Sequence, residues 1–235
     1  MNIGVDEVEL LVRVIPLAIG ASFTPSLLGL QLLTSGSQKW FLRSLAVASG
    51  SGLAFLIACV ALTAGFATLP KTTPHSPDII GGYIWSAAAL VLAGMAVWLF
   101  IPHPDLAKSA EQGLTKRIAK AKPVTFFAFA FALSIKDITS FALLVPAIHD
   151  VSVSHVPWWL QLPTILVIYI IAMVPVLLPP VWRLIRGEKG NAQLARLFRF
   201  TMDHQFIILG VMASVFAIYC ALIAVGPHEF ALIGS

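Results

Sequence analysis

Charged residues are scarce in this chain, and their scarcity indicates its class. Only 11% of the 235 residues are Asp, Glu, Lys or Arg, whereas a soluble domain carries roughly 25%. With 58% hydrophobic residues, the chain is predicted to be a membrane protein made almost entirely of spans, without a separate soluble domain. The net charge of +4 does not indicate nucleic-acid binding, because the basic residues lie in short segments between apolar runs. We therefore expect membrane lipids, and no nucleic acid, among its partners.

Several motifs and residue types are also missing. The sequence has no Walker A motif, no HExxH and no GxSxG, so we predict no ATP hydrolysis by this chain, no enzymatic activity and no cofactor. Its two cysteines, Cys59 and Cys220, both lie inside apolar runs, so no disulfide framework is indicated. No metal site is predicted, because no pair of histidines has convincing ligand spacing. Four histidines on the expected outer side are interpreted as loop residues: His75, His149, His155 and His228.

Long apolar runs make up most of the sequence. About 20 apolar residues, each rising ~1.5 Å, cross a hydrocarbon core of ~30 Å, and in lipid only a helix satisfies their backbone groups. The acidic N-terminus lacks the basic start of a secretory signal peptide, so the first run is interpreted as a retained span. Six runs qualify as spans, at about residues 10–33, 45–69, 79–101, 124–148, 160–182 and 206–225.

The basic residues between these runs predict the orientation. Twelve of the fifteen Lys and Arg residues lie between spans one and two, three and four, and five and six. By the positive-inside rule these connections are cytoplasmic, among them the basic loop 108–123, and both termini lie outside. The stretch 191–202 is basic and amphipathic, so we expect it to lie along the cytoplasmic face.

The loop 108–123 divides the chain into two halves of three spans, residues 1–107 and 124–235. Because the number of spans per half is odd, two related halves would be inverted in the membrane. The first span of each half is interrupted near its middle, at Pro25 and at Lys136-Asp137. We therefore predict an all-α polytopic membrane protein of two inverted three-helix repeats, with a binding site between the interrupted helices one and four.

The two interruptions can be compared residue by residue. Aligning Ser22 with Ser134 places Thr24 opposite Lys136 and Pro25 opposite Asp137. Pro25 removes the backbone hydrogen bond to residue 21, so freed carbonyls and half-helix ends could hold an ion or a charged head group. A simple proline kink is the alternative reading of Pro25, since prolines are common in membrane helices.

Asp137 is the only carboxylate deep in any predicted span. A charge at the centre of a span costs at least ~2.5 kcal/mol on insertion scales, so such residues mark functional sites. Asp137 is predicted to be a proton or cation site, with a structural ion pair or a packing hydrogen bond as the alternative. Lys136 is predicted to be its counter-charge or a site for an anionic head group, with snorkelling as the alternative.

Further polar residues near the two interruptions could line the same cavity. The candidates are Thr24, Ser26 and Gln31 in the first span, and Ser134, Thr139 and Ser140 in the fourth. For each one alone, a hydrogen bond between helices or to the preceding turn is the alternative. A ladder of small residues in the second span (Ala46, Gly50, Ala54 and Ala58) predicts close helix packing within the fold, with a dimer interface as the alternative.

The sequence resembles the lysine-exporter superfamily of small six-span bacterial transporters, and more narrowly its glycolipid-addressing branch. The resemblance lies in Ile15-Pro16-Leu17-Ala18-Ile19-Gly20-Ala21-Ser22-Phe23-Thr24-Pro25 and in Ser134-Ile135-Lys136-Asp137. The family has a small-residue and proline motif in its first span, and a segment like Asn-Pro-Lys-Asn in its fourth. The resemblance implies two inverted three-helix repeats, a location in the bacterial plasma membrane, and export of a small solute or envelope glycolipid, and it allows a homodimer.

Three functional hypotheses follow. The first is a secondary active exporter of a small solute or of an envelope lipid or glycolipid precursor, with proton coupling through Asp137. The second is a non-transporting factor that helps a glycolipid-export complex to assemble. The third, a transmembrane thiol oxidoreductase, requires cysteines at the interruptions, and Cys59 and Cys220 lie elsewhere in the sequence.

Overall fold

The computed structural model describes residues 3–37, 39–69, 79–101, 121–154 and 156–225, and all of its regular elements are helices. In chain order these are α1 (Ile3–Ser22), α2 (Pro25–Ser35), α3 (Trp40–Phe66), α4 (Ile79–Phe100), α6 (Pro123–Ile135), α7 (Ile138–Val153), α8 (Trp158–Arg186) and α9 (Glu188–Val225). Most of the predicted loop 108–123, together with His75, His155 and His228, lies outside the described residues.

Four of these helices are long and apolar enough to cross a membrane: α3, α4, α8 and the 203–225 part of α9. Two further pairs pass the same test together, each bent at a short break. The angle is 57° between the 10–22 part of α1 and α2, and 64° between α6 and α7. The described residues therefore contain four helices that are long and apolar enough to span a membrane, or up to six if each bent pair is one span. The two predicted interruptions are confirmed.

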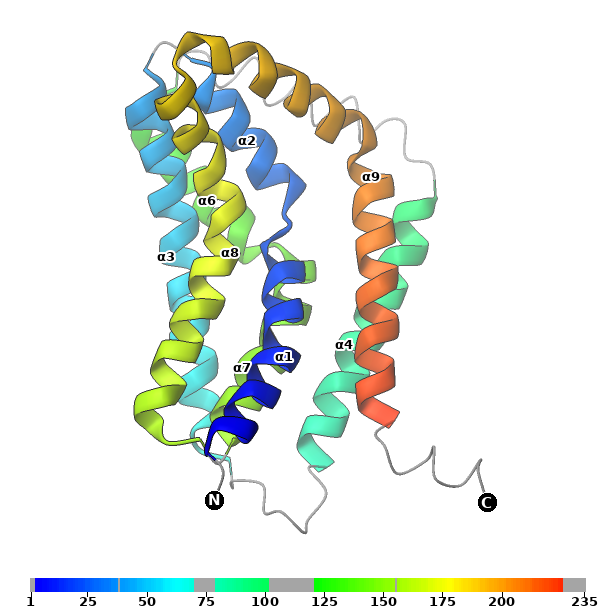
Figure 1. Ribbon diagram of the computed structural model, residues 1–235. Coiled ribbons are helices and arrows are strands. Elements are labelled where there is room, and N and C mark those ends of the chain that lie inside the picture. The colour runs from blue at the N-terminus through cyan, green and yellow to red at the C-terminus, as the bar shows by residue number, and fades with distance from the viewer. Residues whose placement is uncertain (1–2, 38, 70–78, 102–120, 155, 226–235) are drawn as a thin grey trace.

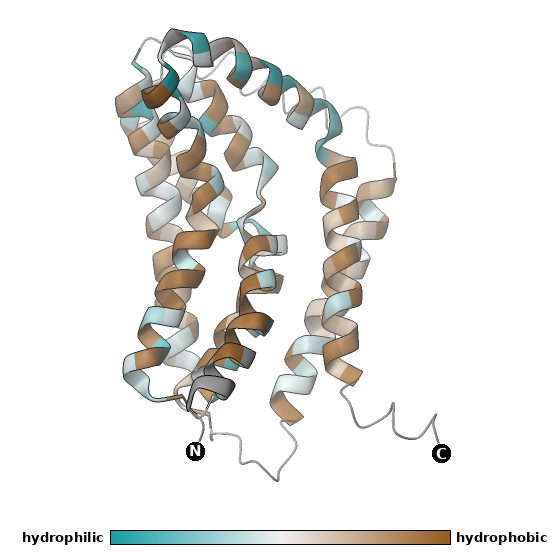
Figure 2. Ribbon diagram, viewed as in Figure 1, coloured by the Kyte–Doolittle hydropathy of each residue, from teal (hydrophilic) through white to brown (hydrophobic). Residues whose placement is uncertain are grey.

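The helices run roughly side by side, and each bent pair leads from one end of the bundle to the other (Figure 1). The start of α1 and the end of α9 lie at the same end of the molecule. The first part of α9 lies across the opposite end before the helix turns down into the bundle, and Figure 2 shows hydrophilic and hydrophobic residues alternating along this part. That placement agrees with the amphipathic segment predicted at residues 191–202.

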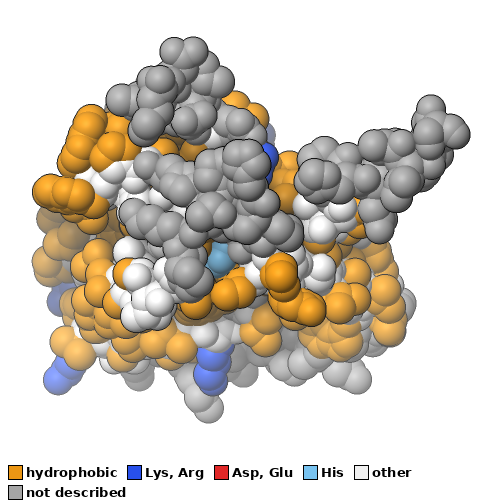
Figure 3. Space-filling model, turned by 90° about the horizontal axis from the view of Figure 1, so that it is seen from below, with side chains coloured by type: hydrophobic (Ala, Val, Ile, Leu, Met, Phe, Trp, Pro, Cys, Tyr) orange, Lys and Arg blue, Asp and Glu red, His pale blue; other side chains and the backbone are white. Residues whose placement is uncertain are grey.

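The outer surface of the bundle is apolar, as expected for helices that face lipid. Large hydrophobic side chains are exposed along the long helices, for example Leu90 on α4, Leu166 on α8 and Ile218 on α9. Hydrophobic side chains also dominate the described surface around the end that carries the termini (Figure 3). Soluble proteins rarely expose so much apolar surface, and together with the candidate spans this surface indicates a multi-pass membrane protein.

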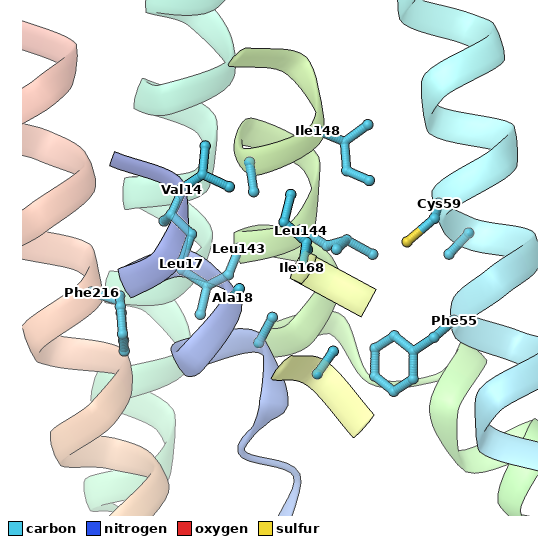
Figure 4. Close-up of a cluster of buried hydrophobic side chains, with 14 of the residues drawn as sticks. Val14, Leu17, Ala18, Phe55, Cys59, Leu143, Leu144, Ile148, Ile168 and Phe216 are labelled. Carbon is cyan, nitrogen blue, oxygen red and sulfur yellow. The ribbon is translucent and has the colours of Figure 1, made fainter. Parts of the chain in front are cut away.

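The core lies where α1 and α7 meet the longer helices. Leu17, Leu143 and Ile168 there are fully or almost fully buried and come from α1, α7 and α8 (Figure 4). Gly20 permits this close approach, because a Cβ at this position would lie 2.5 Å from the ring of Phe216 on α9. The interior is thus filled by small and aliphatic side chains that hold the two broken helices against their neighbours.

The ladder of small residues on α3 serves packing within the fold. Its member Gly50 faces α6, where an added Cβ would overlap the backbone oxygen of Phe127. Ala54 and Ala58 are buried as well. Small side chains let two helix backbones approach each other closely, so the predicted close packing is confirmed at this contact.

Basic side chains tie the helix ends together at the end opposite the termini. The Arg183 guanidinium donates a hydrogen bond to the backbone oxygen of Ser37 at 3.2 Å and lies over the ring of Trp40, 4.8 Å from its centroid. Arg43 lies over the ring of Phe126 at 5.2 Å in the same manner. Cation–π contacts of this kind keep the charges near the membrane surface while their stems cover apolar groups.

Candidate functional site

The two helix breaks face each other inside the bundle. One break comprises Phe23 and Thr24, between α1 and α2, and the other comprises Lys136 and Asp137, between α6 and α7. The hydroxyl of Thr24 donates a hydrogen bond to Oδ2 of Asp137 at 2.5 Å, joining residues 113 positions apart in the chain. The structure therefore brings together the two interruptions that the sequence marks separately.

Both breaks arise from local backbone chemistry. Pro25 is the first residue of α2, where a proline is favoured because its fixed φ suits the first turn and the missing N–H has no helical partner to lose. Thr24, directly before it, is extended at φ −112° and ψ 95°, as a residue before proline prefers. Asp137 precedes α7 as its N-cap, and its Oδ1 accepts the backbone N–H of Ser140 at 3.2 Å.

These positions correct the alignment of the two interruptions by one residue. Thr24 and Asp137 each immediately precede the second helix of a bent pair, so by position in the break Thr24 matches Asp137, whereas the sequence alignment places Thr24 opposite Lys136. Both halves, α2 and α7, direct their N-terminal ends at the junction. Helix N-termini carry partial positive charge, which favours an acidic group between them.

Ser140 completes the junction on the side of α7. Its hydroxyl oxygen lies 2.7 Å from Oδ2 of Asp137, 2.6 Å from the carbonyl oxygen of Ala21 and 3.2 Å from the hydroxyl of Thr24. Ser140 is 1% exposed and Thr24 is 7% exposed, whereas Asp137 is half-buried. We name Ala21, Thr24, Asp137 and Ser140 the break junction.

Pro25 explains why Ala21 takes part. In an uninterrupted helix the carbonyl of Ala21 would accept the N–H of residue 25, but proline has none. The hydroxyl of Ser140 lies at hydrogen-bond distance from this freed carbonyl. The carbonyl of Ala21 is therefore bonded by a side chain from the other half of the chain, and the binding of an ion or a charged head group there stays a prediction.

Lys136 does not behave as the counter-charge of Asp137. Within the described part of the chain, these two neighbours form no ion pair, and the Lys136 side chain is exposed at the C-terminal end of α6. The alternative of a structural ion pair for Asp137 is therefore wrong, whereas the alternative of a packing hydrogen bond matches the contacts with Thr24 and Ser140.

The remaining predicted site residues lie outside the junction contacts. Ser134 donates to the carbonyl of Ala130 in the preceding turn at 2.9 Å, as the structural alternative predicts. Ser26 is exposed on α2. Thr139 is buried with its hydroxyl 3.4 Å from the sulfur of Met95 on α4.

Gln31 belongs to a separate buried polar cluster between α2 and α3. Its amide donates to the carbonyl of Ser44 at 3.2 Å, and the Ser44 hydroxyl lies 3.2 Å from that of Ser35 and 3.4 Å from that of Thr34. Gln31, Thr34 and Ser35 are fully buried. The cluster joins two consecutive helices near the basic end, so for Gln31 the alternative of a hydrogen bond between helices is the correct reading.

A third polar cluster lies at the other end of α7, where the sequence analysis placed His149 in a loop. His149 is fully buried, not a loop residue, because α7 continues to Val153. Its Nδ1 lies 3.5 Å from Oδ1 of Asp150, which also accepts the indole N–H of Trp85 at 3.2 Å. The residues that follow the histidine, Val151-Ser152-Val153-Ser154, carry no helical periodicity, so the sequence gives no signal that the helix extends past it.

The break junction is suited to binding a small cation or a proton. It combines one carboxyl group, two hydroxyls and a freed carbonyl, all oxygen ligands in a largely buried position. The described residues contain no group of three His, Cys, Asp or Glu side chains that could hold a metal. The two cysteines are buried in α3 and α9, away from both breaks.

Comparison with protein-family models, with curated proteins and with solved structures finds no match to this chain.

Proposed function

We propose that the chain is a secondary active exporter whose ion and substrate site is the break junction. The observation that carries the proposal is the contact between Thr24 and Asp137, which joins the starts of α2 and α7 in the interior of the bundle. Transporters place their sites where two broken helices meet, because half-helix ends and freed carbonyls can bind ions there. An acid kept in such a position at the cost of its desolvation is expected to serve transport.

The proposal includes six spans arranged as two inverted repeats. The contacts between helices support it, because they come in matching pairs when α1, α2, α3 and α4 are exchanged with α6, α7, α8 and α9. Thus α1 packs on α8 and α6 on α3, α2 on α9 and α7 on α4, and α2 on α3 and α7 on α8. The contact of α8 with α9 is an exception, since no α3–α4 contact of similar extent occurs among the described residues.

Orientation and location complete the proposal. The described basic residues Arg43, Arg183 and Arg186 lie at the end of the bundle opposite the termini, which favours cytoplasmic placement of that end and outside termini. The resemblance to the lysine-exporter superfamily supports the bacterial plasma membrane as the location, and a small solute or an envelope glycolipid precursor as the cargo. Lys136 is exposed beside the junction, and we assign to it the binding of the anionic part of such a cargo.

The test compares intracellular and extracellular metabolites and surface lipids in cells that lack the protein, or carry the wild type, Asp137→Asn or Asp203→Asn. The two variants make the same chemical change, but Asp203 is exposed and outside the junction. We expect a compound to accumulate inside both the deficient cells and those with Asp137→Asn, but not with Asp203→Asn.

Normal export with a correctly inserted Asp137→Asn protein would contradict the proposal. A change confined to surface glycolipids, equal in wild type and variant, would also contradict it and favour the assembly factor.

A further inference from the structure

The first part of α9, residues 188–202, crosses the basic end of the bundle before the helix turns down as a span (Figure 1). It follows α8 after a single residue, Gly187, whose φ of 57° lies in the left-handed region that favours glycine. The turn at this glycine sets α9 at an angle to α8. As a result, about four helical turns lie along the end of the bundle and do not continue α8 away from it.

One face of this segment is seated on its neighbours. Gly190, Leu194 and Thr201 are buried, and their spacing of four and seven residues places them on one side of the helix. A Cβ added to Gly190 would lie 3.5 Å from Cδ1 of Trp182 on α8. The indole N–H of Trp182 donates a hydrogen bond to Oε1 of Gln193 at 3.1 Å. The first part of α9 is therefore held to α8 by packing and by a hydrogen bond between side chains.

The opposite face carries exposed basic side chains. Lys189, Arg196 and Arg199 are all exposed, and their spacing of seven and three residues places them together, away from the buried face. Leu197 and Phe200 are exposed beside them, at 40% and 56%. A helix that exposes basic and large apolar side chains together is typical of the interface between membrane and water.

The charge of this region is mainly positive. Residues 186–203 contain four basic residues and two acids, and the acids, Glu188 and Asp203, stand near the two ends of the stretch. The fourth basic residue, Arg186, is exposed at the end of α8, with its guanidinium 5.2 Å from the ring centroid of Trp182. We name the four basic residues together the basic surface: Arg186, Lys189, Arg196 and Arg199. An excess of positive charge of this kind attracts an anionic partner.

The residues on either side show at which depth the basic surface lies. Leu184 and Ile185 are large, apolar and exposed directly before it on α8, and Ile207 is so shortly after it on α9. Such side chains on spanning helices belong in the hydrocarbon of the bilayer. The basic surface between them therefore lies at the level of the lipid head groups, where tryptophans such as Trp182 are also enriched.

We propose that the basic surface binds the head groups of anionic phospholipids in the leaflet at the basic end. The charged head group is the anion present at this depth, and each Lys or Arg near an anionic lipid surface favours binding. Leu197 and Phe200 lie at the boundary of the acyl chains in this arrangement. The inference goes beyond the proposed function and does not depend on it, because lipid binding is measured on the purified protein without any cargo.

Native mass spectrometry of the full chain in detergent tests the proposal. The protein is titrated with phosphatidylglycerol, which is anionic, and with phosphatidylcholine of the same acyl chains, which has a phosphate but no net charge. We expect the wild type to retain phosphatidylglycerol in preference. Arg196→Gln combined with Arg199→Gln should lower the apparent affinity for phosphatidylglycerol at least about fivefold, the effect typical of one basic residue near an anionic surface. Its affinity for phosphatidylcholine should change little.

Lys39→Gln combined with Lys122→Gln is the matched control. Both lysines are exposed and adjoin helices at the same end of the bundle, so the control removes the same charge outside the basic surface. Its affinity for phosphatidylglycerol should stay close to that of the wild type. An equal loss in the two double variants would overturn the proposal, since the charge of the whole end would then be responsible. A wild type without any preference would also overturn it and leave this face of α9 merely solvated.

Spin labelling in vesicles that contain phosphatidylglycerol tests the depth separately. A nitroxide attached to Phe200→Cys should collide more often with oxygen, which concentrates in the hydrocarbon, than with a water-soluble nickel chelate. The native Cys59 and Cys220 are buried and stay unlabelled. More frequent collisions with the nickel chelate would place this face of α9 in water and contradict the proposal.

Discussion

Pro25 connects backbone chemistry with the candidate site at the scale of a single residue. It ends the hydrogen-bond ladder of α1, begins α2 and leaves the carbonyl of Ala21 for Ser140. The chain contains other prolines within its helices, such as Pro16 in α1, Pro146 in α7 and Pro175 in α8, where the helix continues. Among these, only Pro25 frees a carbonyl that meets a side chain of the other broken helix pair in the described part of the chain.

Pro25→Ala is expected to damage transport without unfolding the protein. An alanine restores the N–H that can bond to Ala21, so α1 and α2 can join into a straighter helix and the hydroxyl of Ser140 loses its acceptor. We expect export to fall at least about tenfold, equivalent to ~1.4 kcal/mol in a rate, with an unchanged or higher melting temperature.

Pro16→Ala is the matched control, since it makes the same change in α1 away from the break. Both variants are compared by export assay and by thermal unfolding in detergent. Equal export by Pro25→Ala and Pro16→Ala would show that the break at Pro25 is only a bend.

At the scale of helices, the broken helices are held in place by neighbouring helices whose backbones pack closely against them. Gly50 lets α3 approach α6, and Gly20 lets α1 approach α9 and α7. The hydrophobic effect does not drive such contacts between helices in lipid, so close packing and buried polar groups replace it. The Gln31 cluster supplies such buried polar groups between α2 and α3.

Gly50→Ala is expected to lower the free energy of unfolding by ~1–3 kcal/mol, the usual cost of overpacking. The added Cβ would overlap a backbone oxygen of α6, which cannot turn aside as a side chain can. Gly65→Ala on the same helix is the control, because no described atom lies within 4 Å of its added Cβ. The alanine at position 65 should stabilise slightly through helix propensity.

Thermal or denaturant unfolding of the two variants in the same detergent measures the difference. Equal stabilities of Gly50→Ala and Gly65→Ala would mean that the contact between α3 and α6 adapts without cost.

The whole molecule has two chemically different ends. Basic side chains and the amphipathic first part of α9 lie at one end, and the termini lie at the other, where hydrophobic side chains cover most of the described surface around the rim (Figures 1–3). Segments that follow α2 and α8 are at the basic end, and the segment that follows α7 is at the end of the termini. The positive-inside rule predicts orientation from this difference in basic residues between the two ends.

Cysteine labelling is expected to place these ends on opposite sides of the membrane. A membrane-impermeant maleimide should label Ser154→Cys, between α7 and α8, in intact cells, and Ser37→Cys, between α2 and α3, only after permeabilisation. The native Cys59 and Cys220 are buried and serve as the unlabelled background. Labelling of both positions from outside would contradict the orientation and the crossing of the bundle by α6 and α7.

Much of the fold could be predicted from the sequence, because lipid imposes strong local rules. Apolar runs of about 20 residues must form helices there, and the predicted run 79–101 differs from α4 (Ile79–Phe100) by a single residue. The interruptions could also be predicted, since Pro25 and a charged pair disturb a span through their own chemistry. The burial of His149 could not, because a histidine near the end of a span suits a loop and a helix equally well.

The sequence by itself determined the helices, their interruptions and the segregation of basic residues, because each depends on the chemistry of neighbouring residues and on the membrane. Only the tertiary structure decided that the interruptions meet, and that Asp137 is hydrogen-bonded to Thr24 and Ser140 and not paired with Lys136. The reason is geometric: a contact between residues 113 positions apart depends on how whole helices pack and rotate.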